Sequence, residues 1–366
     1  MKKNILLQFV LGTVLLAYTA CNGDRTINTE EPQKPLRGPY DNGIIIKNEG
    51  TWTDMNASVD FISNDFTKFT PNIYNLTNNE ELGKVLISIA FKDDLAYMVL
   101  NSSNVVKIVN RYTFKKVGEI TKGIKNPRNV TTTDKYIYVT NNTSFEPNSY
   151  VSIYNASDFS FVKNISLDNG AEKITIASGN IFVENSPALS DKSKISYING
   201  MTNTLQSVIN IPNGRILNLI SENNDVYAIA SKYKEADSYI YKVSGQGTLT
   251  KTIVLRGIAS ASDLIIYKGK FYFTSGAKIY SMDINADNPP AAPLFTTSLN
   301  NRDGFFTGFS IIDDKIFTAE SDQYEDTSTV HVYTLTGAPV KTFTTGRGTS
   351  GLNLFFYKLI SPLSPV

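Results

Sequence analysis

The chain has 366 residues, of which 41% are hydrophobic and 19% are charged, so it can bury a sizeable core and is not expected to be disordered. Thirty-five basic residues balance thirty-four acidic ones, and the net charge of +1 argues against a dedicated nucleic-acid binder. The single cysteine, Cys21, excludes an internal disulfide and a thiolate metal site.

The first twenty residues read as a secretory signal peptide. A basic start is followed by an apolar run from Ile5 to Tyr18, which is too short to span a bilayer comfortably. The small residues Thr19 and Ala20 then lead into Cys21, and this arrangement resembles a bacterial lipoprotein signal. The resemblance implies that Cys21 becomes the first residue of the mature protein and carries lipid. Ordinary signal cleavage beside an unmodified cysteine is the alternative.

Residues 21–42 are predicted to form a lipidated, flexible tether. They include Pro32, Pro35 and Pro39, many polar or charged residues and no apolar period. A flexible coil of this length reaches about 25 Å on average, enough to hold a domain clear of lipid head groups.

A four-residue pattern recurs through the rest of the chain. Each copy holds a turn residue, an arbitrary residue, an apolar residue and an aromatic residue that enters a strand, as in Asn224-Asp225-Val226-Tyr227. Successive closing aromatics are 41, 44, 45, 45 and 45 residues apart. A period in the low forties with four short strands is typical of β-propeller blades. The closing aromatics are Tyr97, Tyr138, Phe182, Tyr227, Tyr272 and Phe317.

The strand pattern predicts an all-β, seven-bladed propeller over residues 43–360, followed by a short tail at 361–366. Three N-terminal strands within residues 44–70 lack a fourth, and one strand at 352–357 is left over. We expect this C-terminal strand to join the N-terminal blade and close the ring, because an open ring exposes unpaired strand edges. Six or eight blades, or a pair of β-sandwiches, are the alternatives. The six complete units, each a four-stranded antiparallel blade, cover 85–120, 128–166, 172–211, 215–254, 261–297 and 306–344.

Five of the eight arginines fall in or beside different loops between blades. Such loops surround the mouth of a propeller's central channel, where ligands usually bind. A guanidinium group offers several fixed donors and stays charged, so a ring of them suits an anionic ligand. The alternative is structural: each arginine caps a carbonyl or pairs with an acid between blades. The predicted ligand-binding residues of this kind are Arg128, Arg215, Arg256, Arg302 and Arg347, with Lys125 in the same zone.

Loops inside the blades add aromatic residues to the same face. An exposed aromatic ring could stack on a flat ligand. For Trp52, the only tryptophan, wedging between two blades is the alternative. The aromatic candidates are Trp52, Phe145, Tyr233 and Tyr324.

The sequence gives no support to catalysis. His331 alternates with Val330 and Val332 on a late strand, which indicates a surface-face residue and not a general base. Glycine patterns of the nucleotide-binding type before a helix are absent, and paired acids fall at tight turns. We therefore predict neither an enzyme nor a metal or cofactor, with a propeller lyase or hydrolase as a minor alternative.

The residues Asn48-Glu49-Gly50-Thr51-Trp52, followed by Asn56-Ala57-Ser58-Val59-Asp60-Phe61, resemble the first blade of surface lipoprotein propellers of Bacteroidetes. This family is described as YncE-like or surface-layer-type, and the resemblance covers roughly residues 43–358. Some of its members capture corrinoids at the cell surface and pass them to a TonB-dependent outer-membrane transporter. The resemblance implies a lipid-anchored protein of the outer membrane, exposed on the cell surface.

These observations predict a protein that captures a bulky micronutrient on its loop face. The resemblance points to a corrinoid, whereas the arginines suit an anionic ferric siderophore, and the sequence leaves both open. The runner-up is a protein-interaction or structural surface module without a small-molecule ligand, which predicts a broad flat patch in place of a deep mouth.

Overall fold

The computed structural model describes residues 36–142, 149–187, 190, 192–297, 299, 306–321 and 326–354, and from Leu36 onward the chain forms one compact unit. The predicted signal peptide, most of the tether and the C-terminal tail lie outside the described residues. So do three of the predicted site residues and the predicted lipidation site, namely Phe145, Arg302, Tyr324 and Cys21.

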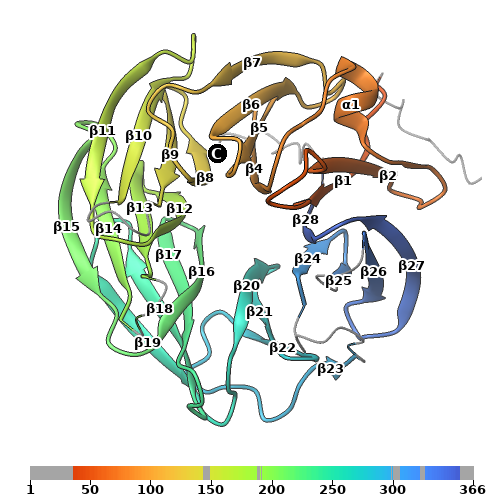
Figure 1. Cartoon of the computed structure of the whole chain (residues 1–366). Helices are drawn as coiled ribbons and strands as arrows, with labels where there is room; N and C mark the ends of the chain where they lie inside the picture. The colour runs from red at the N-terminus through yellow and green to blue at the C-terminus, as the bar shows by residue number, and fades with distance from the viewer. Residues whose placement is uncertain are drawn as a thin grey trace, which may run out of the picture. The chain divides into compact units, whose positions relative to one another are not determined.

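Seven four-stranded antiparallel sheets follow one another around a ring (Figure 1). The predicted seven-bladed propeller is thus confirmed. Blade 1 holds β28 (Thr349–Leu354), β1 (Gly43–Asn48), β2 (Ser58–Ser63) and β3 (Phe69–Thr70), and blade 2 holds β4 (Leu86–Lys92), β5 (Leu95–Leu100), β6 (Val105–Asn110) and β7 (Lys116–Ile120). Blade 3 holds β8 (Pro127–Thr132), β9 (Tyr136–Asn141), β10 (Ser149–Asn155) and β11 (Phe161–Leu167), and blade 4 holds β12 (Ala171–Ala177), β13 (Asn180–Asn185), β14 (Lys194–Asn199) and β15 (Thr204–Asn210). Blade 5 holds β16 (Arg215–Glu222), β17 (Asp225–Ser231), β18 (Ser238–Ser244) and β19 (Leu249–Leu255). Blade 6 holds β20 (Ser262–Tyr267), β21 (Lys270–Ser275), β22 (Lys278–Asp283) and β23 (Phe295–Thr296), and blade 7 holds β24 (Gly308–Ile312), β25 (Lys315–Ser321), β26 (Thr327–Thr334) and β27 (Pro339–Gly346).

The C-terminal strand closes the ring, as predicted. β28 pairs antiparallel with β1, and Ile46 lies opposite Leu352 in the register. The two ends of the chain therefore share one blade, in which β28 is the strand nearest the ring axis (Figure 1). The strand itself begins at Thr349, three residues before the predicted start.

The repeated aromatic residues explain the regular spacing of the blades. All six lie on the second strand of blades 2 to 7 and are buried. The tight turns before several of these strands have two consecutive residues of positive φ, for example Ser178 (49°) with Gly179 (74°). Such turns match the twist of a hairpin, so the turn residue of the repeat sets the register of each first pair of strands.

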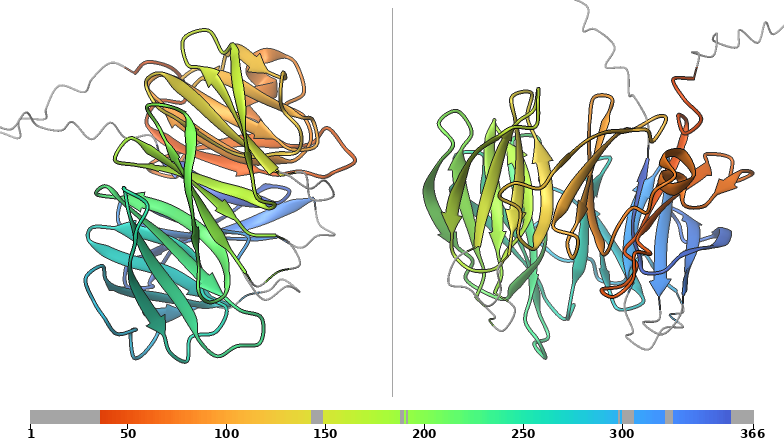
Figure 2. Two further views of the ribbon diagram at one scale, coloured as in Figure 1. Left: turned by 90° about the vertical axis from the view of Figure 1, so that its left-hand side faces the viewer. Right: turned by 45° about the horizontal axis from the view of Figure 1, so that its top comes forward.

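The strands of each blade run between two opposite faces (Figure 2). One face carries the connections between blades and those between second and third strands, and we call it the loop face. The helix α1 (Ile73–Asn78) belongs to one such connection. Described loop-face connections are 49–57, 71–85, 101–104, 121–126, 168–170, 211–214, 232–237, 256–261, 276–277 and 347–348.

Candidate functional site

The four described arginines of the predicted set, Arg128, Arg215, Arg256 and Arg347, lie at the loop-face ends of their blades, and two of them bind carboxylates. Arg128 is the second residue of β8, and its Nε lies 2.6 Å from the Glu172 carboxylate of the next blade. Arg347 lies in the β27–β28 turn, and its guanidinium donates to Asp326 at 3.0 Å. Pairing of an arginine with an acid is what the structural alternative predicts. A ligand-binding role for the arginines stays a prediction.

The remaining basic candidates are spread around the ring. Arg215 begins β16, and both Arg256 and Lys125 are exposed in connections between blades. These three residues lie in or beside three different connections between blades, and a shared binding role for them stays a prediction.

Trp52 and Tyr233 are displayed to solvent. Tyr233 is 80% exposed in the β17–β18 loop, and Trp52 is 65% exposed, so it does not wedge between blades. The Trp52 loop is held by its own hydrogen bonds, from the Thr51 hydroxyl to Asp54 at 3.0 Å and from the Thr51 amide to the Asn56 side chain at 2.7 Å. A loop fixed in this way presents its tryptophan in one place at little entropic cost.

Two predicted elements do meet at the closing point of the ring. The Gly50 amide donates to the Arg347 carbonyl at 3.1 Å, and the Glu49 amide donates to the Gly348 carbonyl at 3.0 Å. The loop of Trp52 and the turn of Arg347 are therefore joined, although 295 residues separate these two residues (347 − 52).

Beside this junction lies a groove of about 880 Å³, which we call the seam groove. It lies between blade 7 and the outer part of blade 1. Its origin is the short strand β3, which pairs only with Phe61 and Ile62 before Pro71 turns the chain away. Proline has no amide hydrogen to continue the ladder, so the start of β2 is left uncovered at its outer edge. The lining residues are Met55, Asn56, Ala57, Ser58, Asp60, Phe69, Pro71, Asn72, Glu81, Asp326, Thr344, Thr345, Gly346 and Arg347.

Asp60 holds three segments together at the bottom of the groove. Its carboxylate accepts hydrogen bonds from the Asn72 amide and the Asn48 side chain, both at 2.8 Å, and from the Gly346 amide at 3.2 Å. Burial raises the pKa of Asp60, and the three donors oppose that rise. One buried carboxylate thus fixes β1, the start of α1 and the end of β27.

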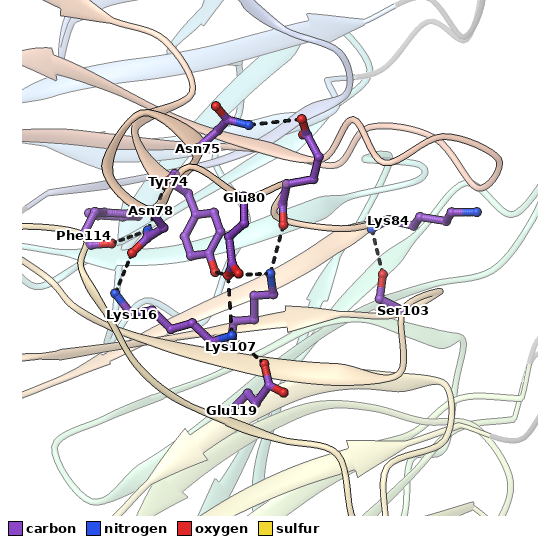
Figure 3. Close-up of polar contacts among 11 residues, drawn as sticks. Tyr74, Asn75, Asn78, Glu80, Lys84, Ser103, Lys107, Phe114, Lys116 and Glu119 are labelled. Carbon is purple, nitrogen blue, oxygen red and sulfur yellow. Dashed lines mark hydrogen bonds and ion pairs between the residues drawn. The ribbon is translucent and has the colours of Figure 1, made fainter.

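The connection 71–85, which contributes Pro71, Asn72 and Glu81 to the groove, is braced from outside by an ionic network (Figure 3). The Tyr74 hydroxyl donates to the Glu80 carboxylate in a short hydrogen bond, and Lys107 of β6 donates to the same carboxylate at 3.2 Å. Lys107 also donates to the Glu81 carbonyl at 2.9 Å, while Lys116 bridges Glu80 and Glu119. These contacts tie the connection that carries Glu81 to blade 2.

Two buried ionisable residues near the loop face were missed from the sequence. Lys47 of β1 donates to the Ile87 carbonyl of β4 at 2.6 Å, and burial lowers its pKa to about 8. Glu184 of β13 is 3% exposed, and burial raises its pKa to about 7. Each follows an apolar run on the second strand of its blade, for example Lys47 after Ile44 to Ile46. A charged residue directly after such a run was the signal in the sequence that could have identified them.

His331 was expected to be a surface-face residue of its strand. It is partly exposed on β26, and its Nε2 lies 3.3 Å from the buried Glu320 carboxylate. Within the described ranges, no group of three or more His, Cys, Asp or Glu side chains could hold a metal ion. In the same part of the chain, no helix is long and apolar enough to cross a membrane.

Residues 42–312 match the model of a family described as "Domain of unknown function (DUF5074)". The chain belongs to this DUF5074 family. The match covers all of blades 2 to 6 and parts of blades 1 and 7, and it supports the propeller side of the predicted resemblance. The YncE-like and corrinoid-related parts of that resemblance stay predictions.

Three solved structures share the fold of this DUF5074 chain. A quinonprotein alcohol dehydrogenase-like protein from Bacteroides thetaiotaomicron is 15% identical with a TM-score of 0.66, over 86% of this chain and 78% of that one. A functionally unknown protein from Desulfotomaculum acetoxidans and a protein from Lactobacillus plantarum are each 13% identical with a TM-score of 0.62, over 85% of this chain and 98% of theirs. At such identities the likeness establishes the fold alone. No curated protein matches the chain.

Proposed function

We propose that this protein is a lipid-anchored surface lipoprotein that captures a bulky small molecule on the loop face of its propeller. It would hand that molecule to a TonB-dependent outer-membrane transporter. The seam groove is the observation that carries the proposal, because its volume of about 880 Å³ lies within the roughly 300–1,000 Å³ typical of small-molecule sites. A corrinoid and a ferric siderophore are the two candidate ligands.

Calorimetric titration of the mature chain tests this proposal. The chain would carry Cys21→Ser so that no lipid is attached, and it would be titrated with cobalamin and with a ferric catecholate. We expect micromolar or tighter binding of one of them. Absence of binding to both at micromolar concentrations would overturn the capture function.

A triple variant separates the two ligands. Replacing Arg128, Arg256 and Arg347 by alanine removes three positive charges from the loop face. Binding of an anionic ferric catecholate should then weaken, because the loop face becomes more negative, whereas binding of a corrinoid should change little. Equal losses for both ligands would instead indicate a damaged fold, which circular dichroism detects.

The exposed outer strand of blade 4 favours a second candidate, a protein-interaction module. β15 is exposed along nearly its whole length, and Met201, directly before it, is 89% exposed. Apolar residues on an unpaired outer edge are a common contact for another polypeptide. If Met201→Ser with Leu205→Ser abolished co-purification of an envelope protein while cobalamin and catecholate failed to bind, this function would replace the first.

A further inference from the structure

The seam groove has an acidic character that the predicted arginines do not share. Its lining includes three carboxylates and one guanidinium group. The guanidinium of Arg347 is already bound to Asp326 at 3.0 Å. Asp60 at the bottom and Glu81 at the rim therefore set the charge that a ligand in the groove meets.

Apolar surface lies beside these carboxylates. Met55 is 48% exposed and Phe69 is 40% exposed, and both line the groove. Trp52 lies three residues before Met55 in the same loop and is 65% exposed. Two large exposed apolar side chains thus line one hollow, and a third lies in the same loop as Met55. This is the arrangement expected of a binding surface and not of scattered surface residues.

The carboxylates are held in place before any ligand arrives. Asp60 accepts three hydrogen bonds from three separate segments. Glu81 accepts a hydrogen bond from the Asn75 side chain at 3.1 Å, and its own carbonyl is bound by Lys107 at 2.9 Å. A ligand that binds to such fixed groups loses less free energy to the ordering of the protein.

From this charge and shape we infer that the seam groove takes a small molecule that carries a cationic group, an ammonium or a guanidinium, on an apolar or aromatic body. The carboxylates of Asp60 and Glu81 would attract the cation. Phe69 and Met55 would cover the apolar body, and an aromatic face also favours a nearby cation. This inference rests on the proposed capture function and narrows it, because a groove that prefers a cationic ligand disfavours an anionic ferric catecholate at that place.

A matched pair of fluorescent probes tests the charge preference. Dansylcadaverine and dansyl-6-aminohexanoate share one fluorophore and a similar linker, but the first ends in an ammonium and the second in a carboxylate. Trp52 is the only tryptophan and lies in a groove loop, so energy transfer from Trp52 to dansyl reports binding at this place. In the mature Cys21→Ser chain, we expect the ammonium probe to bind on the order of tenfold more tightly.

Removal of the rim carboxylate of Glu81 is the decisive variant. Glu81→Gln changes an exposed residue and leaves the Arg347–Asp326 pair intact, so the fold should survive, and the preference for the ammonium probe should fall markedly. The control is Asp93→Asn, which removes one exposed carboxylate from the opposite face and should leave the preference unchanged. A preference that survives loss of the Glu81 carboxylate overturns the inference.

The remaining outcomes separate this inference from the capture function. If the carboxylate probe binds equally well or better and still receives energy from Trp52, the groove captures ligands but the cationic class is overturned. If neither probe binds while cobalamin or a ferric catecholate does, capture occurs elsewhere on the loop face and the groove assignment is overturned. If nothing binds, both proposals fall.

Discussion

Glu184 gives the protein a pH-dependent stability at the scale of one residue. Burial raises its pKa from 4.5 to about 7, so between these values the folded state holds a proton that the unfolded state has lost. Stability from this group therefore falls as the pH rises through that window. The full shift corresponds to about 3 kcal/mol. We expect Glu184→Gln to be more stable than the parent at pH 8, by up to this amount, and similar to it near pH 4.5.

Urea unfolding at several pH values between 4.5 and 8 measures the effect. The matched control is Glu222→Gln, which makes the same chemical change at an exposed position at the end of β16. Only the difference between variant and parent is used, so the titration of Asp60 and other acids cancels. A parallel pH profile for the Glu184→Gln variant and the parent would contradict the prediction.

Pairing between side chains is the part of the site that the sequence could not predict at this scale. Arg128 was placed correctly at the loop-face end of its blade, but its partner Glu172 lies 44 residues later. The repeat predicts that the two strands are neighbours and does not predict which way each side chain turns. Loop positions alone therefore do not reveal that Arg128 and Arg347 are paired with carboxylates.

At the scale of elements, α1 is predicted to depend on Tyr74 for its position. The hydroxyl group of Tyr74 binds Glu80, which also binds Lys107 of blade 2. Tyr74→Phe leaves the ring packed but removes this buried hydrogen bond, at a cost of about 1–3 kcal/mol. We expect lower stability to urea and faster hydrogen exchange over residues 72–86, with exchange elsewhere unchanged.

Tyr97→Phe is the control for this prediction. Tyr97 is also buried, in blade 2, and none of the hydrogen bonds found among the described residues involves its hydroxyl group. Its loss should therefore cost less than the loss of the Tyr74 hydroxyl. Equal destabilisation by the two substitutions would show that the Tyr74–Glu80 contact does not position α1.

The elements themselves were largely predictable because turn residues and aromatics recur at equivalent places. Both ends of each of the six complete blades agree with the predicted ranges to within two residues. The exception is the first blade, where the third of the three strands expected within residues 44–70 is only two residues long. Asp65 instead accepts hydrogen bonds from Ser63 and Thr67 and makes a turn, which leaves only Phe69 and Thr70 in β3. The seam groove exists because of this local turn chemistry, which alternation of apolar residues does not reveal.

At the scale of the whole molecule, ring closure is the feature on which the loop-face sites depend. β28 covers β1, whose residues Ile44, Ile45 and Ile46 are at most 1% exposed. The Thr349 hydroxyl also donates to the Asn48 side chain at 2.6 Å, and the Ser350 hydroxyl donates to Glu49 at 2.5 Å. Removal of β28 would expose the β1 edge and break the junction that holds the Trp52 loop beside Arg347.

A chain that stops after Gly348 is therefore expected to lose cooperative unfolding and to aggregate, whereas a chain that stops after Tyr357 keeps β28 and should remain monomeric. Size-exclusion chromatography and thermal unfolding distinguish these states. Blade 1 should not keep its fold without β28, because the buried isoleucines of β1 would face water and the backbone amides of β1 would lack partners.

A permuted chain tests whether the strand itself or its place in the sequence matters. Residues 349–357 would be joined through a flexible linker before Gly43, and the C-terminal copy would be deleted. This should restore the monomer, because pairing requires a strand beside β1 and does not depend on where that strand lies in the sequence. A monomeric, cooperatively unfolding chain without either copy would show that the ring does not need this closure.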